Sequence, residues 1–237
     1  MTRRRWIADE VSGLNAALVG EHAQHLSRVL RARVGQEFDI SAGDRVRRGR
    51  IVSITDERVE FELGEEVSAS RRPRITLALS IFKFDRMEWA IEKCTELGVA
   101  RIIPVVARRT DIHLAAAASK RVERWQRIAR ETAEQSRQPA TPEISQAMKL
   151  KDALTLEGKT RIVLSESERQ TMLKDVLQAR SADDLVLAFG PEGGWTESEL
   201  AMFREAGWVS ASLGDTILRA ETAAIAALAI VVSELGC

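Results

Sequence analysis

The sequence predicts an α/β protein with a mostly parallel sheet, preceded by a smaller unit built mainly of β-strands. From Pro73 onward, apolar segments of strand length alternate with segments that carry apolar residues at helical spacing. The first of these, residues 75–82, is a continuous apolar run, as a parallel strand covered on both faces requires. Before Pro73 the strand patterns are short. We therefore expect two domains, residues 1–72 and 73–237.

The N-terminal unit is expected to contain one helix and several strands. A helix over residues 22–31 would place Leu26, Val29 and Leu30 on one face. The polar run 64–72 ends before a proline and is the predicted boundary. Strands are expected at residues 37–41, 47–54 and 58–63, with a turn at 42–44.

Capping residues and apolar spacing define the elements of the larger unit. Asp85 is predicted as the N-cap of one helix, and Ser119 as the N-cap of a long basic helix that runs to Arg137. Pro104 interrupts the strand 102–106, which indicates an edge strand or a bulge. Further strands are expected at 161–165, 184–189 and 208–213, and further helices near 170–180, 196–206 and 219–235.

The composition predicts a soluble globular protein. Of 237 residues, 45% are hydrophobic and 30% charged, and Lys+Arg and Asp+Glu both number 35. The zero balance argues against an anionic partner, but it hides a gradient: the segments 1–72, 73–145 and 146–237 carry +1, +4 and −5. A basic face for a polyanion therefore remains compatible with the total charge.

Cysteine usage and the apolar runs indicate a cytoplasmic protein with no metal and no membrane partner. Cys94 and Cys237 are too few for a disulfide framework and lack metal-ligand spacing. The arginine cluster at 3–5 is not followed by the apolar stretch of a secretory signal. The longest apolar run, 223–232, is about half of the ~20 residues that a membrane span needs.

A glycine-rich loop at residues 190–194 follows the strand predicted at 184–189. It precedes a helix with Thr196 at the N-cap and Glu199 at the capping-box position. Ligands of open α/β sheets bind beyond the carboxyl ends of strands, so a binding loop is favoured over an ordinary turn. The spacing matches neither a dinucleotide-binding fingerprint nor a P-loop, which disfavours a nicotinamide dehydrogenase.

A second candidate loop, residues 213–219, leads into a helix that is apolar nearly all round. Such a helix is buried either within the fold or against another subunit. Arg219 and Glu221 stand at its start. They are either a structural cap and salt bridge or part of a site, and two glycine-bearing strand ends with charged residues favour the site.

At these two loops the chain resembles the SPOUT class of RNA methyltransferases. Within that class it is similar to the family that methylates N3 of a uridine in 16S ribosomal RNA. The resemblance extends over nearly the whole chain, and the ordered motifs make a chance match improbable. The matching segments are residues 25–31, 85–98, 134–137 with 142–144, 190–194 and 213–223.

The resemblance implies an N-terminal PUA-like β-barrel that binds RNA, a C-terminal domain tied in a trefoil knot, and a homodimer. It also implies S-adenosylmethionine as cofactor and 16S rRNA or the small ribosomal subunit as partner. The residues that it assigns to the cofactor are Leu164, Ser165, Glu166, Phe189, Gly190, Glu192, Gly193, Gly194, Leu213, Gly214, Ile217, Leu218 and Thr222. Two departures are the loss of a usual basic residue at Asp215 and Thr216, and of a glycine after Lys83.

Methyl transfer to N3 of uridine requires stabilisation of the N3 anion and alignment of the reacting atoms. Arg219 cannot act as a base because its guanidinium stays protonated, but it could hold a uracil carbonyl. Our hypothesis is that Arg219 does so and that Glu221 orients Arg219 or the donor. Both are therefore the candidate catalytic residues.

Basic side chains on the first helix, the predicted hairpin and the α/β domain are the candidates for contact with RNA. Singly, each is more often a solvated surface charge. The arginines at 45–50 are the strongest candidates, since they repel one another without an anionic partner. The full set is Arg28, Arg31, Arg45, Arg47, Arg48, Arg50, Lys83, Arg86, Arg108, Arg109 and Arg137.

Two other functions remain open at this point. The donor site alone does not define the acceptor, so a methyltransferase with a different RNA target is one alternative. A non-catalytic RNA-binding assembly factor is the other. His22, His25 and His113 lack a paired carboxylate motif and are expected to be ordinary helix or loop residues, and Trp195 is expected to pack rather than to stack on a base.

Overall fold

The computed structural model describes residues 5–42, 45–67, 73–179 and 184–235. The chain divides into two compact units, of which the first comprises 1–71 and 133–141 and the second 72–132 and 142–237. The first unit is thus not one continuous segment, which differs from the predicted division, because the chain returns to it at 133–141. The predicted turn at 42–44 and the end of the predicted boundary, 68–72, lie in part outside the described residues.

The first unit contains one six-stranded sheet in the order β1-β4-β5-β6-β3-β2. Its pairs are antiparallel except for β1 with β4. The side chains of Leu18, Ile40, Val59 and Phe61 fill its core. The strands are β1 (Arg5–Ile7), β2 (Glu10–Ser12), β3 (Asn15–Val19), β4 (Glu37–Ala42), β5 (Arg45–Ile54) and β6 (Arg58–Glu66).

The sequence-based interpretation of this unit was right for β4, β5 and β6 and missed the first three strands, which are three to five residues long. The predicted helix is the short α1 (Glu21–Gln24) continued by a π-helical turn, η1 (His25–Val29). The wider turn rotates Val29 out of the predicted face, so Val29 is 66% exposed while Leu26 is fully buried.

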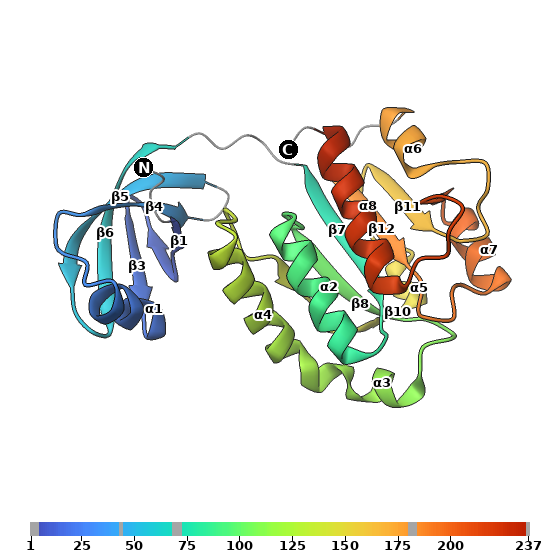
Figure 1. Cartoon of the computed structure of the whole chain (residues 1–237), viewed down its shortest axis with the longest axis horizontal. Helices are drawn as coiled ribbons and strands as arrows, with labels where there is room; N and C mark the ends of the chain where they lie inside the picture. Colours follow the sequence, from blue (N-terminus) through green and yellow to red (C-terminus); the bar gives the residue numbers. More distant parts are fainter. Residues whose placement is uncertain (1–4, 43–44, 68–72, 180–183, 236–237) are drawn as a thin grey trace. The chain divides into compact units, whose positions relative to one another are not determined.

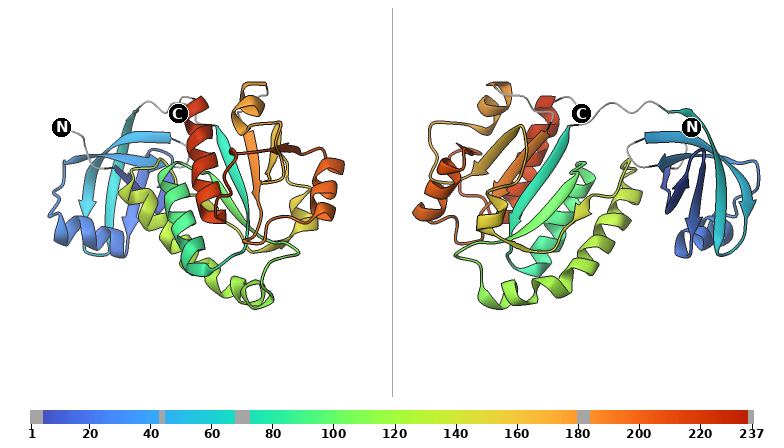
Figure 2. Two further views of the ribbon diagram at one scale, coloured as in Figure 1. Left: turned by 45° about the vertical axis from the view of Figure 1, so that its right-hand side comes forward. Right: turned by 180° about the vertical axis from the view of Figure 1, so that it is seen from behind.

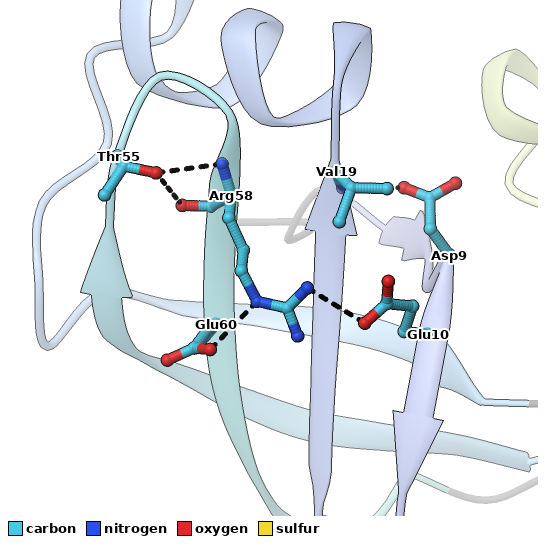
Figure 3. Close-up of polar contacts among 6 residues, drawn as sticks. All are labelled: Asp9, Glu10, Val19, Thr55, Arg58 and Glu60. Atoms are coloured by element: carbon cyan, nitrogen blue, oxygen red, sulfur yellow. Dashed lines mark hydrogen bonds and ion pairs between the residues drawn. The ribbon is translucent and has the colours of Figure 1, made fainter.

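Charged residues of this sheet pair with one another across the strands. The Arg58 guanidinium donates to Glu60 and to Glu10, both at 2.9 Å, and the Thr55 hydroxyl closes the turn before Arg58 (Figure 3). The Asp9 carboxylate accepts from the main-chain N–H of Val19. Because carboxylates stand opposite arginines, a strand rich in charge remains compatible with a stable sheet.

The second unit contains a seven-stranded, entirely parallel sheet, which confirms the predicted α/β class (Figure 1). The order is β10-β8-β7-β12-β11-β13, and β9 also pairs with β8. The strands are β7 (Arg74–Ser80), β8 (Arg101–Val106), β9 (Glu143–Ile144), β10 (Met148–Lys149), β11 (Thr160–Leu164), β12 (Asp184–Phe189) and β13 (Val209–Ala211).

Helices cover both faces of this sheet. Residues of α2, α4, α6 and α8 share one core cluster with alternate residues of β7, while α5 and α7 pack on the opposite face with Trp195, Phe203 and Trp208 (Figures 1 and 2). The helices are α2 (Phe84–Glu96), α3 (Ile112–Ala117), the 3-10 turn η2 (Ala118–Arg121), α4 (Val122–Gln135), α5 (Leu150–Ala153), α6 (Leu173–Ala179), α7 (Glu197–Glu205) and α8 (Ala220–Leu235).

Two predicted helix N-caps of this unit were wrong. Lys83, not Asp85, is the N-cap of α2, and Asp85 lies in its first turn. Ser119 lies inside η2, and the capping residue of this region is Asp111, whose carboxylate accepts from two N–H groups of α3. Asp85 has the right chemistry for the start of a helix, but α2 begins earlier than its capping pattern suggests. The same is true of the region around Ser119, where the helical segment begins at α3.

Pro104 is not on an edge strand, because β8 pairs with β7 on one side and with β9 and β10 on the other. The main-chain carbonyl of Ile102, two residues before Pro104, accepts from Ser145 directly after β9. The main-chain nitrogen of Pro104 therefore points to the same side of β8 as the Ile102 carbonyl, toward the gap between the end of β9 and the start of β10. A proline is tolerated there because no ladder N–H is required of it.

No helix in the described ranges is both long and apolar enough to cross a membrane.

Candidate functional site: a cavity at three strand ends

A cavity of about 410 Å³ lies where the carboxyl ends of three adjacent strands meet. In the sheet, β11 stands between β12 and β13, and all three run parallel. The loops that follow them, together with the start of α8, therefore line one space. This is the edge of an open α/β sheet where ligands bind.

The cavity wall contains every residue that the sequence assigned to the cofactor except Thr222. Thr222 is exposed and lies instead on an apolar groove with Trp89 and Ile225. The sequence-based interpretation also missed part of the wall. Pro191, Thr216 and Ala220 lie within the loops 189–194 and 213–222 that the resemblance assigned to the cofactor; the wall residues outside the assigned segments are Ser212 and Ala223, together with Arg86, which was assigned to RNA.

The glycine loop is held in a defined shape. The main-chain N–H of Gly194 donates to the carbonyl of Pro191 at 2.8 Å, which closes a turn. Gly194 has a φ of +68°, and a Cβ at this position would collide with the Glu166 carboxylate. The positive φ favours glycine here, and any larger residue would also displace the Glu166 carboxylate.

Behind the loop, Trp195 is buried and donates its indole N–H to the carbonyl of Leu164 at 3.0 Å. Its ring packs edge-on against Phe203. The predicted packing role of Trp195 is therefore confirmed. The predicted capping box is also present: the Thr196 side chain accepts from Glu199 N–H, while the Glu199 carboxylate accepts from Thr196 N–H.

The two candidate catalytic residues are in different environments. Arg219 lines the cavity and is exposed, and no ion pair joins it to any described residue. Glu221 is buried, with a side chain 4% exposed. Its Oε2 atom has no hydrogen-bond partner among the described residues, and its Oε1 atom lies 3.8 Å from Arg86 Nε. Glu221 therefore faces Arg86, not Arg219 as one form of the hypothesis required.

Arg86 connects two acidic residues of the site. Its Nη1 atom donates to Glu192 of the glycine loop at 2.9 Å, and its Nε atom faces Glu221. Sequence reasoning treated Arg86 as a surface residue of α2. The sequence offered no signal for this contact, because it depends on the sheet order, in which β7, the strand before Arg86, is the neighbour of β12, whose end carries the glycine loop.

The described residues contain no cluster of three or more His, Cys, Asp or Glu side chains that could hold a metal ion. Burial raises the pKa of the Cys94 thiol to about 12, so Cys94 is not a nucleophile at neutral pH. His113 is exposed.

Comparison with known proteins identifies the family. An RNA methyltransferase domain model matches residues 70–232. The chain is 30% identical to ribosomal RNA small subunit methyltransferase E of Bacillus subtilis, over 91% of this chain and 88% of that protein. It is 32% identical to the protein of the same name from Synechocystis, over 93% of this chain and 74% of that protein.

The chain belongs to the ribosomal RNA small subunit methyltransferase E family.

Solved structures of similar proteins support this assignment. The methyltransferase E of Neisseria gonorrhoeae, solved bound to S-adenosyl methionine, is 31% identical with a TM-score of 0.82 over 98% of both chains. A protein from Legionella pneumophila, solved with bound SAM cofactor, is 26% identical with a TM-score of 0.78 over 98% of both chains.

The RNA candidates fall into two groups. Most of those on the first unit's sheet and helix are ion-paired: Arg28 with Asp56, Arg45 with Glu66, Arg48 with Glu37 and Asp39, and Arg50 with Glu62. Among the described residues, the candidates without an ion pair are Arg31, Arg47, Lys83, Arg108, Arg109 and Arg137. The argument that the cluster at 45–50 requires an external anion was wrong, because neighbouring strands supply carboxylates.

Proposed function

We propose that this chain transfers the methyl group of S-adenosylmethionine to N3 of a uridine in 16S ribosomal RNA. The observation that carries the proposal is the cavity at the ends of β11, β12 and β13, lined by the loops that the family resemblance assigns to the donor. A member of the same family, from N. gonorrhoeae, was solved bound to S-adenosyl methionine.

The residues of the cavity fit such a donor. Its volume of about 410 Å³ is within the range of roughly 300–1,000 Å³ for small-molecule sites. Leu164, Phe189 and Leu213 supply apolar surface for a flat base. Glu192 is neutralised by Arg86, but Glu166 is exposed at the wall without an ion pair to any described residue, so its carboxylate can face a positively charged sulfonium.

S-adenosylmethionine supplies a methyl group that is already activated, so the protein's task is alignment and stabilisation of charge. Arg219 would donate to a uracil carbonyl and stabilise the negative charge that develops when N3 loses its proton. Glu221 would hold Arg86, which in turn holds Glu192 of the glycine loop. We assign Arg219 to the acceptor and Glu221 to the shape of the donor site.

Because N3 lies on the Watson–Crick edge, the target uridine must be unpaired or flipped out. We propose that the first unit is a PUA-like barrel that holds the folded RNA, in the cytoplasm, through basic residues such as Arg31 and Arg47.

The arrangement of the second unit supports a trefoil knot, as the family resemblance implies. The chain passes from β11 to β12 on one side and then to β13 on the other, before α8 returns to contact α2 and β12. A homodimer through the exposed side of α8 and α2 is supported by the apolar groove beside Trp89, which is 47% exposed.

The proposal is tested with small subunits from cells that lack the gene. The purified chain and S-adenosylmethionine are added, the 16S rRNA is digested, and its nucleosides are analysed by mass spectrometry. We expect N3-methyluridine to appear. A different methylated nucleoside would indicate another target, and donor binding without any methylation would favour a non-catalytic assembly factor.

A further inference from the structure

We infer that Arg109 is a positioning residue that fixes the glycine loop of the donor site and is not a contact for RNA. The inference rests on the proposed function, because it assigns a role to a residue beside the donor cavity. Arg109 itself does not line that cavity. It lies in the loop between β8 and α3, on the outer side of the glycine loop.

The guanidinium of Arg109 is directed at the main chain of the glycine loop. Its Nη1 atom donates to the carbonyl of Gly193 at 2.6 Å and, more weakly, to the carbonyl of Trp195 at 3.4 Å. Hydrogen bonds from a charged donor are stronger than neutral ones, and this one is short. Arg109 thus anchors the middle of a loop that has no side chains at Gly193 and Gly194.

The aliphatic part of Arg109 also packs against the loop. A Cβ placed on Gly193 would lie 3.2 Å from Arg109 Cδ and 3.4 Å from Arg109 Cβ. This spacing is tighter than ordinary van der Waals contact. The glycine at 193 therefore has a second reason beyond ligand access: it makes room for the arginine that holds the loop.

The segment that carries Arg109 is itself well fixed. Thr110 and Ala107 exchange hydrogen bonds across a tight turn, and Asp111 then caps α3. The main-chain N–H of Arg108 donates to Glu199 at 2.7 Å. Since Glu199 is 4% exposed and also caps α7, one buried carboxylate joins this turn to the helix after the glycine loop.

These contacts imply that Arg109 acts on donor binding through preorganisation. Glycines lose more conformational freedom than other residues when they become ordered. A loop that is already ordered does not incur this cost again when the ligand binds. Without Arg109, the peptide at Gly193 would have to be ordered by the donor itself, and donor affinity would fall without the loss of any direct contact.

The experiment compares Arg109→Ala, Arg109→Lys and Arg108→Ala in the full chain, with S-adenosylmethionine titrated in a calorimeter. We expect Arg109→Ala to raise the donor Kd about tenfold, as loss of one charge-assisted hydrogen bond predicts. Arg109→Lys should restore part of the affinity because an ammonium can still donate to the Gly193 carbonyl. Arg108→Ala is the matched control: its N–H remains, so its donor Kd should not change.

A second measurement is independent of the donor. Hydrogen exchange of the peptide that contains residues 190–195 should be faster in ligand-free Arg109→Ala than in wild type. In Arg109→Lys it should be slower than in Arg109→Ala. An unchanged melting temperature shows that the fold is intact. Gly193→Ala should weaken donor binding less in the Arg109→Ala background, because the atom closest to the added methyl group, Arg109 Cδ, is gone.

The outcomes separate the two proposals. If the wild-type chain binds S-adenosylmethionine but Arg109→Ala binds it equally well and exchanges equally slowly, the role of Arg109 is overturned and the proposed function stands. If Arg109→Ala raises the KM for RNA and leaves the donor Kd unchanged, Arg109 is an RNA contact. If wild type does not bind the donor, the proposed function fails, while the exchange of residues 190–195 still decides whether Arg109 fixes the loop.

Discussion

The charges of the first unit and those of the donor cavity are paired to different degrees. In the first unit, Arg58 bridges two glutamates and His22 lies between two carboxylates. At the cavity, Arg219 is exposed without an ion pair to any described residue. Behind the wall, one oxygen of the buried Glu221 has no hydrogen-bond partner among the described residues. Paired charges stabilise the fold that holds them, whereas charges left unsatisfied are available to a ligand.

The strongest test of this contrast is Arg219→Ala. We expect turnover to fall by a factor of about 100 to 1,000, the usual effect of removing one donor that stabilises a developing anion. The donor Kd should stay within about threefold, because the side chain serves the acceptor. Steady-state kinetics with small subunits and calorimetry with S-adenosylmethionine measure the two effects.

The control for this variant is Arg204→Ala, on an exposed side of α7 and outside the cavity. Its turnover should match that of wild type. If Arg219→Ala reduced donor binding and turnover equally, Arg219 would belong to the donor site, and the contrast between acceptor and donor residues would be wrong.

An effect of intermediate size, on the stability of the fold, is expected from His22, which lies between two carboxylates of the first unit. The Nε2 atom is 2.9 Å from Glu134 and the Nδ1 atom 2.9 Å from Asp9. Hydrogen bonds to these carboxylates, with Glu134 the larger contributor, raise the pKa of His22 to about 9 despite its partial burial. The folded state therefore binds the imidazole proton more tightly than the unfolded state.

Because the folded pKa is raised, this stabilisation is fully present below the unfolded pKa of 6.5 and is lost as the pH rises through about 9. It should amount to roughly 2 kcal/mol after allowance for solvent screening. Urea denaturation of wild type and of His22→Gln across this range measures it. In His22→Gln, the free energy of unfolding should no longer show this dependence on pH. An equal slope of unfolding free energy against pH in both proteins would mean that His22 is not the titrating group.

The smallest effect concerns two arginines of the same strand, β5. Arg50 is paired with Glu62 at 2.9 Å, whereas no ion pair joins Arg47 to the described residues. We expect Arg47→Ala to weaken binding of 16S rRNA about threefold and to reduce the slope of log K against log salt by about 1. Arg50→Ala should change both quantities less.

Filter binding at several salt concentrations compares the two variants, which each remove one positive charge. If both variants lost the same affinity for 16S rRNA, pairing with a carboxylate of the protein would not prevent an arginine from binding RNA. The division between paired and unpaired arginines would then not predict RNA binding on this surface.

Local sequence signals predicted the parts of the fold that depend on neighbouring residues. The run 184–189 is β12 to the residue, and Thr196 with Glu199 forms the capping box. The signals failed where several helix starts compete, as at Asp85 and Ser119, because capping chemistry occurs at more positions than helices begin. They also failed at Val29, where a π-helical turn changes the angular spacing.

The sequence by itself determined that this protein has a parallel α/β domain and which loops follow its strand ends, because periodicity and glycine placement are local properties. Only the tertiary structure decided what faces those loops. Arg86 and Arg109 are distant in the sequence from the glycine loop and were assigned to RNA, yet both contact it. The sequence shows that a residue is charged but not which group its side chain contacts. The contacts of Arg86 and Arg109 are fixed only when the order of the strands in the sheet brings the strand ends together.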